Sequence, residues 1–567
     1  MEKMKLRIKI LLSYSVVFPD RHDRIEDLLC DIPSATAIEV LSYRLSQKMN
    51  QLIGQHDFEI WMPWLMQTRS DVRNPVGKYV EQHNLSNYAM IDTYAMLLLI
   101  SKLLVSYNGR HKDLTKDDIS NLFLSYLICC DERLELSETP PDNKLNAEKF
   151  VDAFLPYAIK TCDFESPRDY RLMLIKCYYL LIEFPRVHAQ FATYIDEFCK
   201  EKGLSSSKAY LDLLFHVFLE LSSGGDPSAS LMRVLPDDQK TIQFLDGFSI
   251  DTEHYQHDMD FKMIREKPLL KTGTHIYDFM FMRMFLDKAY TGLLFDMRDV
   301  LVKRGLLDER EGYGRLKSML GEDFSERFFF YTLMKRCFGK KYVNYCGEEL
   351  QKQLGKGMPD FYLRRGNRIF LFECKDAQIA SVKKFSGDIT IVKNAIYEKY
   401  VQNTKGHGKG VAQLANVISD KLPEILSMVD TTAPKCVKYI FPIIVYFDDC
   451  FDLEGPNYFL DKELKRIVKG KTISVDYIVR DLVMVNVEQL MRFENYFADD
   501  KLKLATLINS YIDFKNRDEI NQVFPFNKFL FREAKNKKCD LGKTRWFDEV
   551  YQNLVALDKK EQINQIL

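Results

Sequence analysis

The chain contains 567 residues, of which 46% are hydrophobic and 28% are charged. These fractions are ordinary for globular proteins and argue against a mostly disordered, collagenous or repeat-only chain. The 80 Lys and Arg residues nearly balance the 81 Asp and Glu residues, which leaves a net charge of -1. No global positive field therefore indicates nucleic-acid binding, and any basic surface must be local.

Cysteine usage and hydropathy favour a cytoplasmic protein. The 12 cysteines show no Cys-x-x-Cys spacing, which excludes zinc-ribbon sites and a dense disulfide framework. The apolar run over residues 10–18 is interrupted by polar residues, and no small-residue cleavage site follows it, so we do not expect a secretory signal. The most apolar later stretch, residues 95–105, is too short to cross a bilayer and contains Lys102. We expect no association with a membrane.

Apolar residues recur three and four positions apart through the first two-fifths of the chain, which predicts an all-helical domain over residues 1–222. In one expected helix, Ile38, Leu41 and Leu45 share a face. The segment 222–230, SSGGDPSAS, is the clearest linker candidate because it contains two glycines and a proline. We expect the helical domain to serve in recognition, regulation or oligomerisation.

The periodicity changes after this linker, and residues 223–320 are expected to form a connecting region. Residues 268–270 and 275–281 flank the turn-forming segment 271–274 and predict a pair of strands. A helical pattern follows over residues 285–301.

Residues 321–490 show the element order of an α/β core with a mixed sheet. The expected elements are a helix over 323–338, strands over 341–346, 360–363 and 368–375, a lysine-rich connection over 376–410, a helix over 411–425, and strands over 439–447 and 475–487. Residues 491–567 are expected to form a helical C-terminal extension. The predicted fold class is therefore multidomain α and α/β.

The most informative stretch is residues 357–375, GMPDFYLRRGNRIFLFECK. Its Arg-Arg-Gly-Asn segment separates two apolar runs and predicts a β-hairpin in which Asp360 begins one strand and Glu373 and Lys375 end the other. Because side chains alternate along a strand, Glu373 and Lys375 share a face. Asp360 and Glu373 are expected to meet.

Charges at the end of a buried strand are costly unless a metal, a partner or solvent compensates them. A divalent cation held by Asp360, Glu373 and the backbone carbonyl of Cys374 would provide that compensation, because oxygen ligands suit Mg²⁺ or Mn²⁺. Lys375 would then lie beside a metal-bound water.

Pro359-Asp360 followed by Glu373-x-Lys375, in this order of elements, resembles the PD-(D/E)xK nuclease superfamily, which has the restriction-endonuclease-like fold. The resemblance covers about residues 323–487. It implies that Asp360 and Glu373 bind the catalytic metal and that Lys375 orients or activates the attacking water.

The same resemblance implies two further site residues. Many members carry an acidic residue on the preceding helix, and Glu326 is the better candidate because apolar residues follow it along one face. Glu348 and Glu349 are the alternatives. Gln413 resembles a glutamine that reaches the site in some members, although the long connection over 376–410 departs from compact members.

A phosphate backbone also needs a basic approach path. Residues 381–413 contain six lysines against two acidic residues, a local net charge of +4. We expect Lys383, Lys384, Lys405 and Lys409 to contact phosphate. An ordinary solvated surface is the alternative interpretation.

The sequence thus favours a Mg²⁺- or Mn²⁺-dependent nuclease that hydrolyses phosphodiester bonds, with DNA as the expected substrate and a role in bacterial restriction or phage defence suggested by analogy. The alternatives are a catalytically inactive, nuclease-like nucleic-acid-binding or scaffold protein and an RNA-directed nuclease. No ATPase motif is present, so we expect either independent action, with a possible homo-oligomer, or a partner subunit that supplies recognition or ATPase activity.

Overall fold

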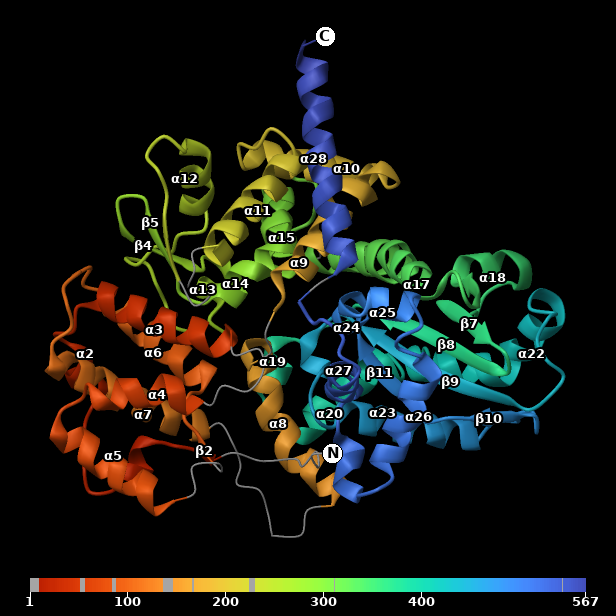
Figure 1. The fold of residues 1–567 in the computed structure, drawn as a ribbon, viewed down its shortest axis with the longest axis horizontal. Coiled ribbons are helices and arrows are strands. Elements are labelled where there is room, and N and C mark those ends of the chain that lie inside the picture. Colours follow the sequence, from red (N-terminus) through yellow and green to blue (C-terminus); the bar gives the residue numbers. More distant parts are fainter. Residues whose placement is uncertain are drawn as a thin grey trace. The chain divides into compact units, whose positions relative to one another are not determined.

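The computed structural model describes residues 10–50, 57–83, 88–135, 146–165, 168–223, 230–310, 312–542 and 544–566. Most of them are helical, and the strands form one six-stranded mixed sheet, one three-stranded sheet and one two-stranded sheet (Figure 1). This agrees with the predicted mixture of helical and α/β structure. Within these residues, no helix is both long and apolar enough to cross a membrane. Residues 224–229 of the expected linker lie outside the described part.

The chain divides into two compact units whose segments alternate along the sequence. Unit 1 comprises Met1–Glu138, Phe164–Cys177 and Thr193–Leu306, and unit 2 comprises Thr139–Asp163, Tyr178–Ala192 and Leu307–Leu567. These limits differ from the boundaries expected at residues 222, 320 and 490. Helix α8 (Ala147–Glu165) lies almost wholly in unit 2, where its Asp152 and Asp163 form ion pairs with Lys393 and Lys384. Periodicity predicts that such a helix exists but not which unit it joins.

Unit 1 is built mainly from helices, as the spacing of its apolar residues predicts. They are α1 (Tyr14–Val17), α2 (Ile25–Leu29), α3 (Ser34–Asn50), α4 (Asp57–Met66), α5 (Ser70–Gln82), α6 (Thr93–Val105), α7 (Lys116–Glu135), α11 (Ser207–Ser223), α12 (Gln239–Asp246) and α13 (Lys262–Glu266). Helices α9 (Tyr170–Tyr178) and α10 (Ala189–Glu201) fall across the unit limits. The expected all-helical region also contains β1 (Ile10–Leu11), which pairs in parallel with β2 (Tyr88–Ala89). Strands of two residues are too short to show an alternating pattern.

The small sheet of unit 1 confirms the strand pair predicted after the linker. Its order is β3 (Leu231–Arg233), β5 (Ile276–Phe279) and β4 (Leu269–Gly273), with antiparallel neighbours. The helix predicted over 285–301 is divided into α14 (Met282–Leu286), the 3-10 turn η4 (Asp287–Ala289) and α15 (Thr291–Lys303). The interruption lies at Tyr290, whose φ of -150° and ψ of -80° are not helical.

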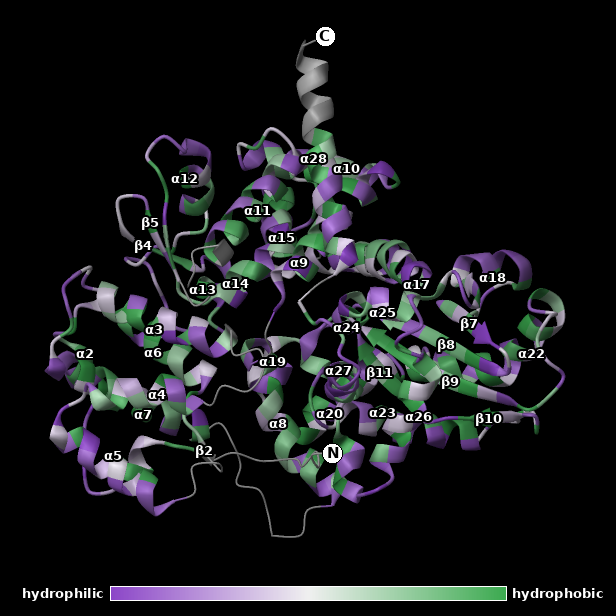
Figure 2. Ribbon diagram, in the orientation of Figure 1, coloured by the Kyte–Doolittle hydropathy of each residue, from purple (hydrophilic) through white to green (hydrophobic). Residues whose placement is uncertain are grey.

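Unit 2 contains the large sheet. Its strands are β6 (Val343–Cys346), β7 (Phe361–Arg365), β8 (Arg368–Lys375), β9 (Lys438–Tyr446), β10 (Tyr477–Val479) and β11 (Val483–Asn486). Strands β6, β7 and β8 are antiparallel neighbours, whereas β9 runs parallel to β8, β10 and β11. Strands β8 and β9 are largely buried, in agreement with their apolar sequences (Figure 2).

The single strand predicted over 475–487 is in fact two strands, β10 and β11, both paired with β9. The pairing shifts by one residue between Val479, opposite Ile440, and Val483, opposite Ile443. Pro442 lies on β9 opposite this gap. Because proline has no N–H group to donate, it interrupts the ladder there.

The remaining elements of unit 2 are helical. They include η2 (Tyr179–Glu183), η3 (Phe184–Arg186), α16 (Gly312–Met319), the π-helical η5 (Leu320–Phe329), α17 (Phe330–Phe338), α18 (Gly347–Leu354), α19 (Ser381–Lys384), α20 (Ile389–Tyr400), α21 (Gly410–Asn416), η6 (Val417–Lys421), α22 (Leu422–Glu424), η7 (Ile425–Val429), η8 (Asp449–Phe451), α23 (Pro456–Lys469), α24 (Val487–Arg492), α25 (Glu494–Ala498), α26 (Leu504–Lys515), η9 (Glu519–Val523), α27 (Phe526–Asn536) and α28 (Arg545–Ile566). The helices predicted over 323–338 and 411–425 are present, and the C-terminal extension is helical as expected. The lysine-rich connection is not an extended loop, because α19 and α20 occupy much of it.

Candidate active site

The acidic residues and the lysine singled out in the sequence lie on adjacent strand ends. Strands β7 and β8 form the predicted antiparallel hairpin and are joined by Gly366 and Asn367. Gly366 has a φ of 62°, a left-handed conformation that glycine adopts without steric cost. Asp360 comes directly before β7, whose first residue pairs with Phe372, and Glu373 comes directly after Phe372. The hairpin therefore places the two acidic residues opposite each other.

Three carboxylates converge on one ammonium group at this end of β8. The Lys375 Nζ atom lies 3.2 Å from Glu373 Oε2, 3.6 Å from Asp360 Oδ2 and 3.8 Å from Glu326 Oε2. Asp360 Oδ2 also accepts a hydrogen bond from the backbone N–H of Cys374 at 2.8 Å. We refer to Asp360, Glu373, Lys375 and Glu326 as the acid–lysine cluster.

Burial varies across the acid–lysine cluster. The Glu373 side chain is 1% exposed, and neither of its carboxylate oxygens takes part in a hydrogen bond. The side chains of Asp360 and Glu326 retain 25% and 22% of their exposure. The cluster therefore has a buried end at Glu373 and an end that solvent or a ligand can reach. Three acidic groups for one lysine leave an excess of negative charge there, which favours binding of a cation.

Burial and neighbouring charges perturb the protonation of these groups. Burial raises the pKa of Glu373 well above its ordinary value, and the nearby Asp360 carboxylate raises it further. Burial also raises the pKa of Glu326, to about 7, although Lys375 opposes this shift. Burial disfavours the charged form of Lys375, but Asp360, Glu373 and Glu326 outweigh that effect and raise its pKa well above its ordinary value. Lys375 thus remains an ammonium group at neutral pH. Perturbed groups gathered in this way are typical of functional sites.

The donor set fits a hard divalent cation. Carboxylate oxygens are the ligands that Mg²⁺ and Mn²⁺ prefer, and the two buried Glu373 oxygens have no hydrogen-bond donor of their own. As they stand, no three His, Cys, Asp or Glu side chains in the described part of the chain lie close enough to share a metal ion. In this arrangement the Lys375 ammonium lies among the carboxylates and supplies the compensating charge.

Glu326 reaches the cluster from η5, where the helix is π-helical. The alternatives Glu348 and Glu349 lie at the start of α18 instead. Glu349 accepts a hydrogen bond from the backbone N–H of Cys346, and Glu348 lies 3.8 Å from Arg327. Of the three acidic candidates, only Glu326 forms an ion pair with the lysine of the cluster.

Asp376 and Lys317 belong to the surroundings of the site, and the sequence reasoning did not identify them. Asp376 accepts hydrogen bonds from Lys317 Nζ and Ser325 Oγ, each at 2.7 Å, and its side chain is 3% exposed. Its backbone N–H also donates to Glu326. These contacts fix η5 beside the end of β8. The sequence signal that could have identified these contacts is the spacing of Lys317 and Ser325, which lie about two helical turns apart.

Two other predicted site residues contact the cluster differently or not at all. Cys374, whose carbonyl was expected to bind metal, contacts Asp360 through its backbone N–H. Gln413 lies on α21, which packs against β8. Its Oε1 atom is buried without a hydrogen-bond partner. Gln413 is thus near the sheet, but the described contacts do not connect it to the acid–lysine cluster.

The four lysines expected to contact phosphate have different environments. We expected Lys384 to contact phosphate. It is buried and pairs with Asp163 at 2.9 Å, so it is not available to a nucleic acid. Lys383 pairs with Glu398 at 2.8 Å. Lys405 is exposed and Lys409 is half-buried, and neither forms an ion pair within the described residues. Of the four lysines expected to contact phosphate, these last two are the ones without an ion pair among the described residues.

Comparisons of the chain with protein-family models, with curated proteins and with solved structures found no match. A functional assignment therefore depends on the chemistry of the residues themselves. The strongest concentration of perturbed groups described above is the acid–lysine cluster at the end of β8.

Proposed function

We propose that the acid–lysine cluster is the active site of a Mg²⁺- or Mn²⁺-dependent nuclease and that unit 2 is a nuclease core of the PD-(D/E)xK type. The observation that carries this proposal is the convergence of Asp360, Glu373 and Glu326 on Lys375, with both Glu373 oxygens buried and without hydrogen-bond donors. Such an arrangement is costly for folding and is typical of a site selected for function.

The topology of unit 2 supports the same proposal. The antiparallel strands β7 and β8 bring the acidic residues together, and the parallel strand β9 completes the centre of a mixed sheet. A long helical segment before the first strand carries Glu326 to the same edge. This order of elements is the one implied by the resemblance of the sequence to PD-(D/E)xK nucleases.

Each residue of the cluster has a role in this proposal. Asp360, Glu373 and Glu326 would hold the cation, which when bound supplies Lewis-acid stabilisation of charge on a phosphate oxygen and a lowered pKa of bound water. Lys375 would orient the attacking water and stabilise negative charge that develops on the phosphate.

The test is a substrate panel with matched variants. Purified protein is incubated with plasmid DNA, linear duplex, single-stranded DNA and RNA in the presence of Mg²⁺, Mn²⁺ or EDTA. We expect metal-dependent cleavage of DNA by the wild type and by Lys352→Ala, a change at an exposed lysine of α18. Asp360→Asn and Lys375→Ala should abolish it. Equal degradation by all four proteins would indicate a contaminating nuclease and would contradict the proposal.

A second candidate is a nuclease-like binding or scaffold protein without catalysis. The specific observation in its favour is that Lys375 itself compensates the carboxylates and that no three described ligand side chains are close enough to share an ion. In this case the protein would retain nucleic acid in a gel-shift assay without cleaving any member of the panel. Cleavage of RNA alone would instead identify an RNA-directed nuclease.

A further inference from the structure

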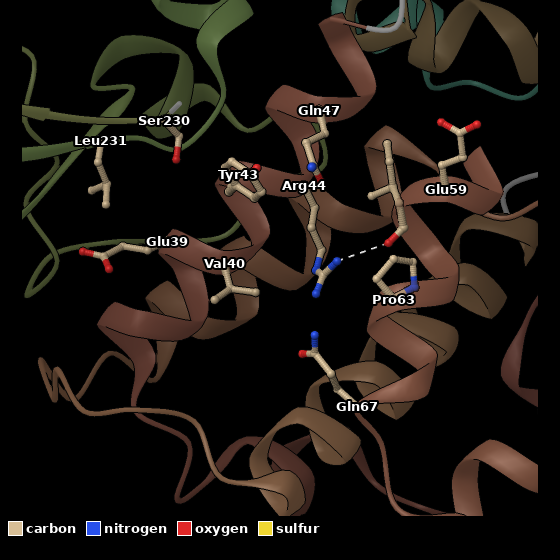
Figure 3. A pocket seen from close by; sticks show the side chains of 11 residues that line it. Glu39, Val40, Tyr43, Arg44, Gln47, Glu59, Pro63, Gln67, Ser230 and Leu231 are labelled. Carbon is tan, nitrogen blue, oxygen red and sulfur yellow. Dashed lines mark hydrogen bonds between the residues drawn. The ribbon is translucent and has the colours of Figure 1, made fainter. Parts of the chain in front are cut away.

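Unit 1 contains a cavity whose lining residues lie far in the sequence from the acid–lysine cluster of unit 2. It has a volume of about 630 Å³ and lies between α3, α4 and the start of β3 (Figure 3). This volume is within the range of small-molecule sites in proteins. All of its lining residues belong to unit 1.

Arg44 of α3 lines this cavity and has no carboxylate partner among the described residues. Its Nη1 atom donates to the backbone carbonyl of Ile60 at 3.2 Å, and its guanidinium carbon lies 4.8 Å from the centre of the Trp64 ring. Its Nε atom is buried without an acceptor. Figure 3 shows the guanidinium group extending from α3 toward Pro63 and Gln67. The remaining nitrogen, Nη2, has no acceptor among the residues that the structure describes.

The Arg44 guanidinium group keeps its positive charge, but no carboxylate among the described residues pairs with it. Burial lowers the pKa of Arg44 to about 10, which still leaves the side chain positively charged at neutral pH. Arg364 of unit 2, which is also poorly exposed, is an example of such a group with a carboxylate partner. Its Nε and Nη2 atoms both donate to the Asp430 carboxylate. An anion bound at Arg44 would supply the partner that Asp430 supplies to Arg364.

The rest of the lining limits the kind of anion. Val40, Ile60 and Leu231 contribute apolar surface. Glu39 and Glu59 also line the cavity, and Glu39 is partly compensated because it contacts His111 at 3.1 Å. Two carboxylates on the wall would repel a multiply charged anion, whereas a single carboxylate can be accepted by one guanidinium group.

We propose that this cavity is a binding site for a small organic monocarboxylate with an apolar body. The ligand carboxylate would accept hydrogen bonds from Arg44, and its body would cover Val40, Ile60 and Leu231. Unit 1 would then act as a small-molecule-binding module, whatever the chemistry of unit 2. The proposal does not depend on nuclease activity and can fail or succeed separately from it.

The test is calorimetric titration of the full chain with three simple probes. They are 3-phenylpropionate, which has the carboxylate and an apolar body, 2-phenylethylamine, which has the same body with the opposite charge, and inorganic phosphate. We expect saturable binding of 3-phenylpropionate and at least tenfold weaker binding of the other two. Arg44→Met should weaken binding of 3-phenylpropionate at least tenfold, and Arg24→Met, a change at an exposed arginine of unit 1 that does not line the cavity, should leave it unchanged.

A second variant keeps the test decisive if Arg44→Met does not fold. Leu231→Trp adds bulk from the β3 wall without touching Arg44 and should also weaken binding at least tenfold, with a far-ultraviolet circular dichroism spectrum like that of the wild type. Absence of saturable binding to the wild type would overturn the proposal. The same conclusion follows if 2-phenylethylamine binds as tightly as 3-phenylpropionate, or if the folded variants bind like the wild type.

Discussion

Two carboxyl groups of this protein are buried to the same degree but have opposite surroundings. Glu373 on β8 of unit 2 and Asp278 on β5 of unit 1 are each 0% exposed. Burial raises the pKa of both, in the case of Asp278 to about 8. Asp278 accepts a hydrogen bond from Ser42 Oγ at 2.7 Å, whereas Glu373 accepts none and faces Lys375 Nζ at 3.2 Å.

The difference shows that burial alone does not identify a functional carboxyl group. Asp278 can be accommodated as a neutral acid, since a hydroxyl group contacts it and no cation pairs with it within the described residues. Glu373 is surrounded by charges of both signs, and protonation would not resolve the repulsion between Asp360 and Glu326. We therefore interpret Asp278 as structural and Glu373 as functional.

The largest expected effect is a difference in nuclease activity between substitutions of Glu373 and of Asp278. Glu373→Gln keeps the shape of the side chain but replaces a carboxylate oxygen that would hold the cation in the proposed site, so nuclease turnover should fall by about 100-fold or more. Asp278→Asn should leave turnover within about twofold, because the acid is already neutral at pH 7. Cleavage of the preferred member of the substrate panel measures both. Loss of activity in both variants, or in neither, would remove the distinction between the two carboxyl groups.

The next effect concerns Lys384, a buried lysine that forms an ion pair with Asp163. The charge of Lys384 also opposes the burial that raises the pKa of Asp448. Lys384→Met leaves these acidic groups without their cation and should lower the free energy of unfolding by about 3 kcal/mol. Urea unfolding measures the change.

The matched control for that experiment is Lys383→Met. Lys383 is adjacent in sequence, but its ion pair with Glu398 is partly exposed, so the change should cost less than about 1 kcal/mol. Similar costs for the two variants would show that burial of the Lys384 pair does not contribute as proposed. The double variant Lys384→Met with Asp163→Leu should recover part of the loss, since it also removes the acidic group that Lys384 compensates.

A further effect appears in the pH dependence of the free energy of unfolding. The pKa of Asp278 is about 8 in the folded protein, against about 3.9 for an unperturbed aspartic acid. The folded state therefore holds a proton that the unfolded state releases, and this contribution to stability is lost as the pH rises from about 4 to about 8. Between these limits the wild type should lose about 1.4 kcal/mol for each pH unit relative to Asp278→Asn.

Urea unfolding of the wild type and Asp278→Asn at pH 5, 6, 7 and 8 checks this slope. Ser42→Ala provides a further control, because Ser42 donates to the ionised carboxylate and its removal should raise the pKa of Asp278 still further. The Glu39 carboxylate also raises the pKa of Asp278. Parallel pH profiles for the wild type and Asp278→Asn would show that Asp278 is ionised in the folded protein.

The same contrast explains what the sequence could and could not predict. The hairpin that brings Asp360 to Glu373 is local, because its turn and its alternating strands lie within 20 residues. Glu326 was identified because its position on an amphipathic helix precedes the sheet. By contrast, the Lys384–Asp163 pair joins residues 221 positions apart, and Ser42 and Asp278 are 236 positions apart. In each pair, the sequence around one residue gives no indication of the other residue.

The unit boundaries were unpredictable for a related reason. Helical periodicity shows that one face of α8 is apolar, but several apolar surfaces in a chain of this size can cover it. The residues that fix its position are charged, and their partners Lys384 and Lys393 lie in the segment that we expected to grip nucleic acid. Two of the six lysines that made that segment look basic are thus committed to holding α8.

The smallest expected effect concerns the lysines that remain. Of the four lysines expected to contact phosphate, Lys405 and Lys409 form no ion pair within the described residues, so these two are still able to meet a phosphate group. If each contacts one phosphate, the double variant Lys405→Ala with Lys409→Ala should reduce the slope of log K against log salt concentration by about 2 on duplex DNA. Fluorescence anisotropy at several salt concentrations measures it. Lys383→Ala should leave the slope nearly unchanged, because Lys383 is already paired with Glu398. If the double variant keeps the wild-type slope, nucleic acid must approach the acid–lysine cluster over other surfaces. The local positive charge of residues 381–413 would then not indicate a phosphate-binding segment.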